Sequence, residues 1–172
     1  LLWQTPTGYD GLTAGSGDLA RNPDFVDAAN GDYHLGICSY AVDTGDDANS
    51  AATDADGDAR PFAGWGGTAV TDIGADERTT VSAPPPWAGF SAETAGLTVT
   101  LTNSSSNATG YSWDFGDGTA VSTAANPSPT YAAPAVYTIT LTATNSSGCT
   151  DVVQTAVTVE AFYVYLPMVI QP

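Results

Sequence analysis

Trp113-Asp114-Phe115-Gly116-Asp117-Gly118, within YSWDFGDGTA, is the most informative part of this 172-residue sequence. An alternating segment, Tyr137-Thr-Ile-Thr-Leu-Thr-Ala-Thr-Asn145, follows about twenty residues later. An aromatic strand that enters a Gly/Asp turn, followed by a strand of alternating polarity, is typical of a small β-sandwich. The spacing predicts that both aromatic side chains anchor a core and that the two glycines permit the turn. The two aspartates are then expected to accept backbone hydrogen bonds in that turn, rather than to act in catalysis.

The composition predicts an all-β protein. The sequence has no Lys, three Glu and one Met, whereas β-branched residues, Gly, Asp and Asn are abundant. Leu97–Thr102 alternates like Tyr137–Thr144, and Val152–Val159 is rich in β-branched residues. Turn residues separate these strands at short intervals, which indicates a sandwich.

Charge divides the chain into two parts. The net charge of −16 argues against nucleic acid and anionic membranes as partners, because phosphate binding needs clustered Lys and Arg. Fourteen of the 19 carboxylates and all three Arg precede residue 79. We expect a first domain at 1–78, a Pro-rich linker at 79–86, a sandwich at 84–160 and an apolar tail at 161–172. No stretch reaches the roughly 20 apolar residues that span a bilayer.

Residues 84–160 resemble a PKD domain, an immunoglobulin-like module of many secreted bacterial proteins. The resemblance rests on Trp113–Gly118, on Asn126-Pro127 and Tyr131, and on Tyr137–Asn145. It implies an extracellular β-sandwich without catalytic activity.

Residues 22–77 resemble the C-terminal cap of secreted bacterial right-handed parallel β-helix proteins of the pectate-lyase-like class. The matching motifs are Asn22–Asp27, Gly31–Leu35, Cys38–Asp46, Asp54–Pro61 and Thr71–Glu77, with Tyr40 where that family usually has Pro. The resemblance implies terminal coils of a solenoid, the last of them at Leu1–Leu19. The groove of such enzymes lies along coils that this sequence lacks, so no catalytic residue is transferred. An open solenoid end exposes unpaired backbone, which a neighbouring subunit would cover.

Asp54, Asp56 and Asp58 alternate around Gly57, as in calcium loops. The twelfth position of the loop is Trp65 and not Glu, which excludes an EF-hand. The three carboxylates either bind Ca²⁺ in another way or cap turns and pair with Arg60. His34 is expected to be a hydrogen-bonded strand residue rather than a metal ligand, because the sequence has no second His.

Two cysteines and three sequons suggest covalent modification. Cys38 and Cys149 either form one disulfide, which would close a loop of over a hundred residues, or remain two buried thiols. Asn103, Asn107 and Asn145 each precede Ser or Thr at the second position, and are either glycosylated or plain turn residues.

The two ends of the chain are apolar and are the expected interaction surface. A tail strand with apolar residues on both faces is a signal for export or anchoring, a strand donated to a neighbouring subunit, or a strand packed on its own domain. The candidate contact residues are Leu1, Leu2, Trp3, Phe162, Tyr163, Val164, Tyr165, Leu166, Met168, Val169 and Ile170.

The sequence therefore predicts a non-catalytic structural or adhesive protein at the extracellular surface of a bacterium. It would act through subunit contacts as a homo-oligomer or filament, or bind other surface proteins or glycans. The first alternative is the C-terminal targeting and binding part of a larger polysaccharide-active enzyme. The second is a calcium-dependent adhesin, with Ca²⁺ as its cofactor.

Overall fold

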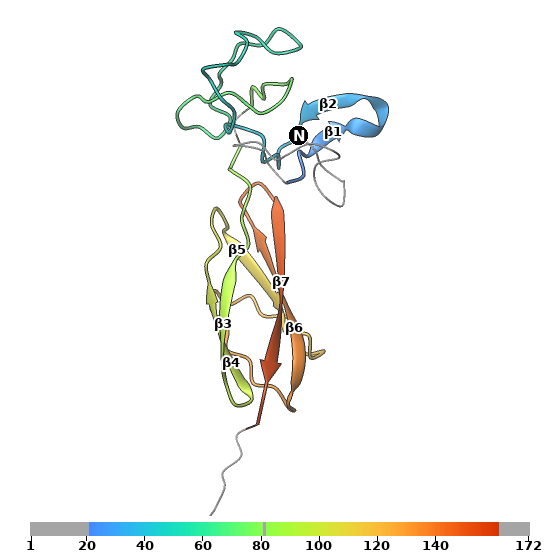
Figure 1. Cartoon of the computed structure of the whole chain (residues 1–172), viewed down its shortest axis with the longest axis vertical. Helices are drawn as coiled ribbons and strands as arrows, with labels where there is room; N and C mark the ends of the chain where they lie inside the picture. The colour runs from blue at the N-terminus through green and yellow to red at the C-terminus, as the bar shows by residue number, and fades with distance from the viewer. Residues whose placement is uncertain (1–20, 81, 162–172) are drawn as a thin grey trace, which may run out of the picture. The chain divides into compact units, whose positions relative to one another are not determined.

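The computed structural model describes residues 21–80 and 82–161 and divides the chain into two compact units (Figure 1). The boundary lies between Pro85 and Pro86. The segment Asn145–Thr150 lies within the first unit, although the strands on either side of it lie in the second. The sequence did not predict that a segment after residue 86 would belong to the first unit.

The second unit is a sandwich of two small sheets (Figure 1). One sheet pairs β3 (Phe90–Ala95) with β4 (Thr98–Asn103) in antiparallel register. The other has the order β5–β6–β7, with β5 at Gly110–Asp114, β6 at Ala135–Thr144 and β7 at Thr150–Val159. The all-β class expected from composition is confirmed: apart from one three-residue 3₁₀ turn, the described residues form strands, turns and loops.

Alternation along the strands builds the core of this sandwich. Val99 and Leu101 of β4 are buried while the threonines between them face outward, and β6 buries Ile139, Leu141 and Ala143 in the same way. Trp113 is fully buried opposite Leu141, and its indole Nε1 donates to the Ala124 carbonyl oxygen at 2.9 Å. Trp113 therefore fills the core without leaving its polar atom unpaired, as a buried Trp requires.

The motif at Asn126–Pro129 borders the outer side of β4. The carbonyl oxygens of Pro129 and Pro127 accept the backbone N–H groups of Val99 and Leu101, at 2.9 and 3.1 Å. A proline has no N–H to donate, so this segment can accept from β4 without presenting a regular edge for a further strand. Tyr131, at the end of the segment, is buried and donates from its hydroxyl to the Phe115 carbonyl oxygen at 3.0 Å.

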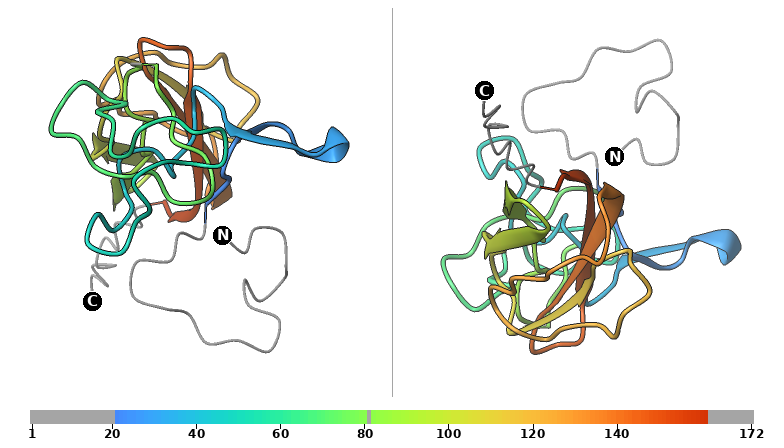
Figure 2. Two further views of the ribbon diagram at one scale, coloured as in Figure 1. Left: turned by 90° about the horizontal axis from the view of Figure 1, so that it is seen from above. Right: turned by 90° about the horizontal axis from the view of Figure 1, so that it is seen from below.

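The first unit has little regular structure. β1 (Phe25–Asp27) and β2 (Asp32–Leu35) form an antiparallel hairpin around the 3₁₀ turn η1 (Ala28–Asn30). Figure 2 shows this hairpin projecting from the loops of its own unit. Residues 36–80 consist of turns and isolated antiparallel bridges, such as Thr53 with Ala59 and Phe62 with Val70. No helix in the described segments is long and apolar enough to cross a membrane.

The structure does not support the expected parallel β-helix cap. All the strand pairings and bridges that it shows within the described part of the first unit are antiparallel, whereas a solenoid cap stacks parallel strands. Residues 1–19, where the last coils were expected, lie outside the described residues. The apolar core of the unit is also small: Leu35, Ala41 and Val42 are buried, with partly buried neighbours around them.

Buried carboxylates hold the loops of the first unit together. The carboxylate of Glu77 accepts the N–H groups of Phe62 and Asp72, at 2.6 and 2.9 Å, and pairs with the Arg60 guanidinium at 3.0 Å. Asp72 is buried as well and accepts the N–H groups of Asp43 and Arg78. Burial raises the pKa of Asp72 to about 6. Backbone N–H groups that a sheet would satisfy are here satisfied by side chains.

Candidate functional site

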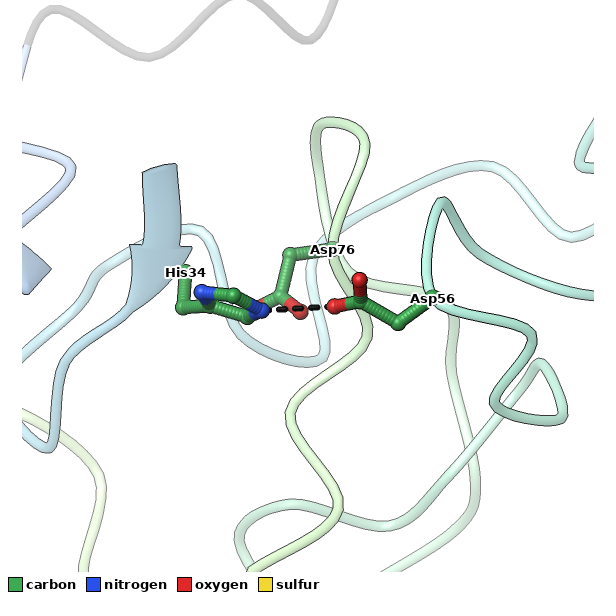
Figure 3. Close-up of side chains that lie close together, drawn as sticks. All are labelled: His34, Asp56 and Asp76. Carbon is green, nitrogen blue, oxygen red and sulfur yellow. Dashed lines mark hydrogen bonds and ion pairs between the residues drawn. The ribbon is translucent and has the colours of Figure 1, made fainter. Parts of the chain in front are cut away.

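His34 on β2 lies between the carboxylates of Asp32 and Asp56, and Figure 3 shows the contact with Asp56. Its Nδ1 is 2.5 Å from Oδ1 of Asp32, and its Nε2 is 2.6 Å from Oδ2 of Asp56. The hydrogen bonds to Asp32 and then to Asp56 raise the pKa of His34 to about 9. The hydrogen bond from His34 lowers the pKa of Asp32 in turn. At neutral pH the imidazole is therefore a cation with a carboxylate at each nitrogen.

Asp76 is the third acidic residue at this ring (Figure 3). Its Oδ2 accepts the backbone N–H of Leu35 at 2.7 Å, which holds it beside β2. His34, Asp56 and Asp76 each offer a ligand atom, and these three atoms lie within 4.8 Å of one another. Within residues 21–80 and 82–161 this is the group of His, Cys, Asp and Glu side chains that converges closely enough to hold a metal ion.

Asp54 brings Asp56 and Asp76 together. Its Oδ1 accepts the N–H groups of Asp56 and Asp58, at 2.9 and 2.8 Å, which closes the acidic turn. Its Oδ2 accepts the N–H of Glu77 at 3.0 Å, and the N–H of Ala55 donates to the carbonyl oxygen of Ala75 at 2.9 Å. The turn is thus fixed against the segment 75–77, because bonds form on both sides of Asp76.

The three aspartates proposed for Ca²⁺ have three different environments. Asp54 accepts backbone hydrogen bonds on both oxygens, Asp56 faces His34, and Asp58 is exposed. They do not converge as one ligand group within the described residues. Arg60, which the sequence suggested as their partner, pairs with Glu77 instead. The alternating spacing of the three aspartates indicates a turn, which the structure has. It does not predict the contact of Asp56 with His34, which lies 22 residues away in the sequence.

The two aspartates of the WDFGDG turn have the capping role expected of them. Asp114 accepts the N–H of Gly116 at 2.8 Å, and Asp117 accepts both the N–H and the hydroxyl of Thr119, at 3.0 and 2.6 Å. Hydrogen bonding lowers the pKa of Asp117. Both aspartates are therefore structural residues of the sandwich.

Cys38 and Cys149 form a disulfide, with their Cα atoms 5.4 Å apart and a sequence separation of 111. Both cysteines lie in the first unit, since the turn 145–150 belongs to it. The disulfide links the loop that follows β2 to the turn between β6 and β7.

The candidate glycosylation sites differ in accessibility. Asn107 is exposed, with a positive φ of 55°, and Asn103 is half-buried and accepts the Ser105 N–H on its Oδ1. Asn145 is buried, and its Nδ2 donates to the carbonyl oxygens of Ala83 and Pro84, at 3.4 and 2.9 Å. A glycan on that nitrogen would take the place of one of its two N–H hydrogens and would have to fit into this buried site.

The candidate interaction residues at the two ends of the chain, 1–3 and 162–170, lie outside the described residues. Within the described part, several large apolar side chains of the second unit are half or more exposed. These are Trp87, Val121, Val136 and Val152, with exposed fractions of 51–66%. Val136 and Val152 lie on the outward-facing side of the alternation in β6 and β7, which accounts for their exposure.

Comparison with known proteins identifies the second unit. A family model described as PKD domain matches residues 72–159. The crystal structure of the PKD1 domain of Vibrio anguillarum Epp is 33% identical, with a TM-score of 0.44, and the match covers 46% of this chain and 99% of that one. The PKD1 domain of the Vibrio cholerae metalloprotease PrtV is 37% identical, with a TM-score of 0.43 and coverage of 45% and 99%. No curated protein matches the chain. Because the family model spans just over half of the sequence, the chain belongs to the PKD domain family.

Proposed function

We propose that this chain is a non-catalytic extracellular module that works through contacts with further copies of itself or with other surface proteins and glycans. The observation that carries the proposal is the PKD sandwich joined to a disulfide-bonded first unit. Disulfides form and persist in oxidising environments such as the bacterial cell surface. The hydrogen bonds of the PKD turn assign its aspartates to structure, which supports a recognition or spacing role.

Exposed apolar surface supports the partner contacts. A single exposed apolar side chain is ordinary on a protein surface. Trp87, Val121, Val136 and Val152, however, all belong to one small sandwich, and the sequence continues with the apolar run Phe162–Ile170. Burial of apolar area at about 25 cal/mol per Å² is the usual source of subunit affinity. The proposal therefore places self-association on the second unit and on the tail that follows it.

Sedimentation velocity tests this proposal. We expect the sedimentation coefficient of the full chain to increase with concentration between about 1 and 300 μM, a range that covers interfaces of moderate affinity. A variant that lacks residues 162–172 should lose most of this increase, and Val136→Ser should reduce it. Val26→Ser, an equally exposed position in the first unit, is the control. A chain that stays monomeric over the whole range contradicts the proposal.

A second candidate is the C-terminal targeting and binding part of a larger secreted polysaccharide-active enzyme. It is favoured by the five motifs between Asn22 and Glu77 that resemble the end of a parallel β-helix protein. The proposal predicts that the gene encodes repeated β-helix coils upstream of Leu1. A gene that begins with a signal sequence directly before Leu1 rules out this candidate and leaves the self-association experiment unaffected.

A further inference from the structure

We propose that His34, Asp56 and Asp76 form a Zn²⁺ site, with Asp32 orienting the imidazole ring. Neither membership of the PKD family nor the proposed extracellular role assigns such a site. Its ligand set is one imidazole nitrogen and two carboxylate oxygens, with a fourth position for water. An open zinc site likewise has three protein ligands and one exchangeable position, and imidazole nitrogen and carboxylate oxygen are both ligand types that zinc accepts.

The three ligands come from separate parts of the first unit and converge on one point (Figure 3). His34 lies on β2, Asp56 in the turn that Asp54 closes, and Asp76 in the segment fixed to that turn. Their ligand atoms lie within 4.8 Å of one another. Zn–N and Zn–O bonds of about 2.1 Å place tetrahedral ligands about 3.4 Å apart. The ligand atoms can move to this shorter separation by rotation of their side chains. The side chains of His34 and Asp56 are 53% and 55% exposed, so they have room to rotate.

Asp32 supplies the second layer of the site. It lies 2.5 Å from Nδ1, the ring nitrogen that faces away from Asp56, and its Oδ1 also accepts the N–H of His34 at 3.1 Å. A carboxylate on the distal nitrogen fixes the ring orientation and raises the basicity of a metal-binding histidine. Here it directs Nε2 toward Asp56, as a zinc ligand requires. Asp76 is held in the same manner, by the N–H of Leu35.

The local charge favours a divalent cation. Three carboxylates surround one imidazole, so even a protonated ring leaves an excess of two negative charges. Arg60 binds the Glu77 carboxylate and backbone carbonyl oxygens, including that of Asp76, and Arg78 binds Thr80 and Ser82. The described hydrogen bonds of both arginines therefore end on groups other than the ligand carboxylates. A bound Zn²⁺ replaces the proton on Nε2 and brings the net charge to −1. Imidazole suits zinc, whereas Ca²⁺ takes six to eight oxygen ligands, which this group does not offer.

A hollow of about 220 Å³ borders the three ligands and is also lined by Gly31, Tyr33, Ala55 and Ala75. A water molecule occupies about 30 Å³ of liquid volume, so the hollow has room for the fourth ligand. It also admits a small oxygen ligand, such as a carboxylate or a sugar hydroxyl, beside the metal. The aromatic ring of Tyr33, 59% exposed, forms part of its wall.

Zinc titration of the metal-stripped full chain tests the site. We expect one Zn²⁺ per chain by isothermal titration calorimetry in ZnCl₂. His34 is the one histidine of the sequence, so its ring ¹⁵N signals report on the site without assignment ambiguity. Bound Zn²⁺ should shift Nε2 by far more than Nδ1. His34→Gln and Asp56→Asn should weaken binding at least tenfold, and Asp32→Asn by about 10- to 100-fold as for other outer ligands.

Asp58→Asn is the matched control, because Asp58 is exposed in the same turn and lies outside the ligand group. It should bind Zn²⁺ with unchanged affinity. Circular dichroism of each variant shows whether a loss of Zn²⁺ binding is caused by a loss of folding. If a variant unfolds, the ring ¹⁵N signals of His34 in the wild-type chain still show whether the imidazole binds the metal. Absence of binding up to 1 mM ZnCl₂ would overturn the proposal. So would binding that leaves the imidazole signals unchanged, or a His34→Gln variant with wild-type affinity, since both place the metal elsewhere.

Discussion

Gly116 shows how a single residue determines the turn after β5. Its φ is +72°, and a Cβ atom at this position would lie 2.5 Å from the carbonyl oxygen of Thr138. Gly118 has a similar φ of +77°, but a Cβ there meets nothing within 4 Å. We expect Gly118→Ala to cost about 1 kcal/mol, from the left-handed backbone alone. Gly116→Ala should cost about 3 kcal/mol or more, because the backbone must also shift. Urea unfolding of both variants tests this, and equal losses would contradict it.

His34 should titrate far above the range of an ordinary histidine in the metal-free chain. Its pKa is raised from 6.5 to about 9, first by Asp32 and then by Asp56. Because the folded pKa is the higher one, the stabilisation is complete below pH 6.5 and is lost as pH rises through 9. We expect an NMR midpoint near 9 in EDTA, lowered in Asp32→Asn. The melting temperature of wild type should exceed that of His34→Asn below pH 6.5, with the difference vanishing by about pH 10. A midpoint near 6.5 would contradict the geometry.

Residues whose role depends on local spacing could be predicted from the sequence, and those whose role depends on distant partners could not. Asp114 and Asp117 cap the turn as expected, because their partners lie two residues away. His34 was expected to be a hydrogen-bonded strand residue, and it lies on β2 with both ring nitrogens hydrogen-bonded, but its distant partners were not predicted. Its partner Asp56 lies 22 residues away and Asp76 further still, and no periodicity connects them.

At the level of elements, the turn between β6 and β7 depends on Asn145. Its Oδ1 accepts the N–H groups of Ser147 and Cys149, and its Nδ2 donates to the Ala83 and Pro84 carbonyl oxygens. We expect Asn145→Ala to lower the free energy of unfolding by about 2–4 kcal/mol, because the side chain is buried and its partners lose their bonds. Asn103→Ala, which removes a cap with one described bond to Ser105, should cost about 1 kcal/mol. Equal losses in guanidinium unfolding would contradict this ranking.

The strands of the sandwich could be predicted because their period of two matches one buried face. β4 and β6 lie within one or two residues of the predicted segments, and Trp113 is buried as expected. In the first unit, buried carboxylates rather than apolar alternation hold the chain. Asp72 and Glu77 resemble ordinary surface acids in the sequence, and only their burial shows that they organise the loops. The parallel coils inferred there from motif resemblance are for this reason unsupported.

At the scale of the whole molecule, the chain is divided in a way that the linker alone does not reveal. The boundary between the two units lies at Pro85–Pro86, in the Pro-rich segment. The first unit is nevertheless assembled from two separated segments, 1–85 and 145–150. The alternation of polar and apolar residues reports only on residues that are close in the sequence. It therefore predicts a turn between β6 and β7, but not the unit whose residues that turn contacts.

The disulfide between these two segments should contribute measurably to the stability of the chain. Cys38–Cys149 spans 111 residues, a loop that contains β3 to β6. In the chain-entropy description, such a cross-link removes about 4–5 kcal/mol of conformational freedom from the unfolded state. We expect the Cys38→Ser/Cys149→Ser variant to lose this amount in guanidinium unfolding, and wild type under reducing conditions to lose about as much. The reducing agent should have no effect on the double variant, which is the control. A loss below about 1 kcal/mol would contradict the prediction, because the cross-link would then restrict an unfolded chain that is already compact.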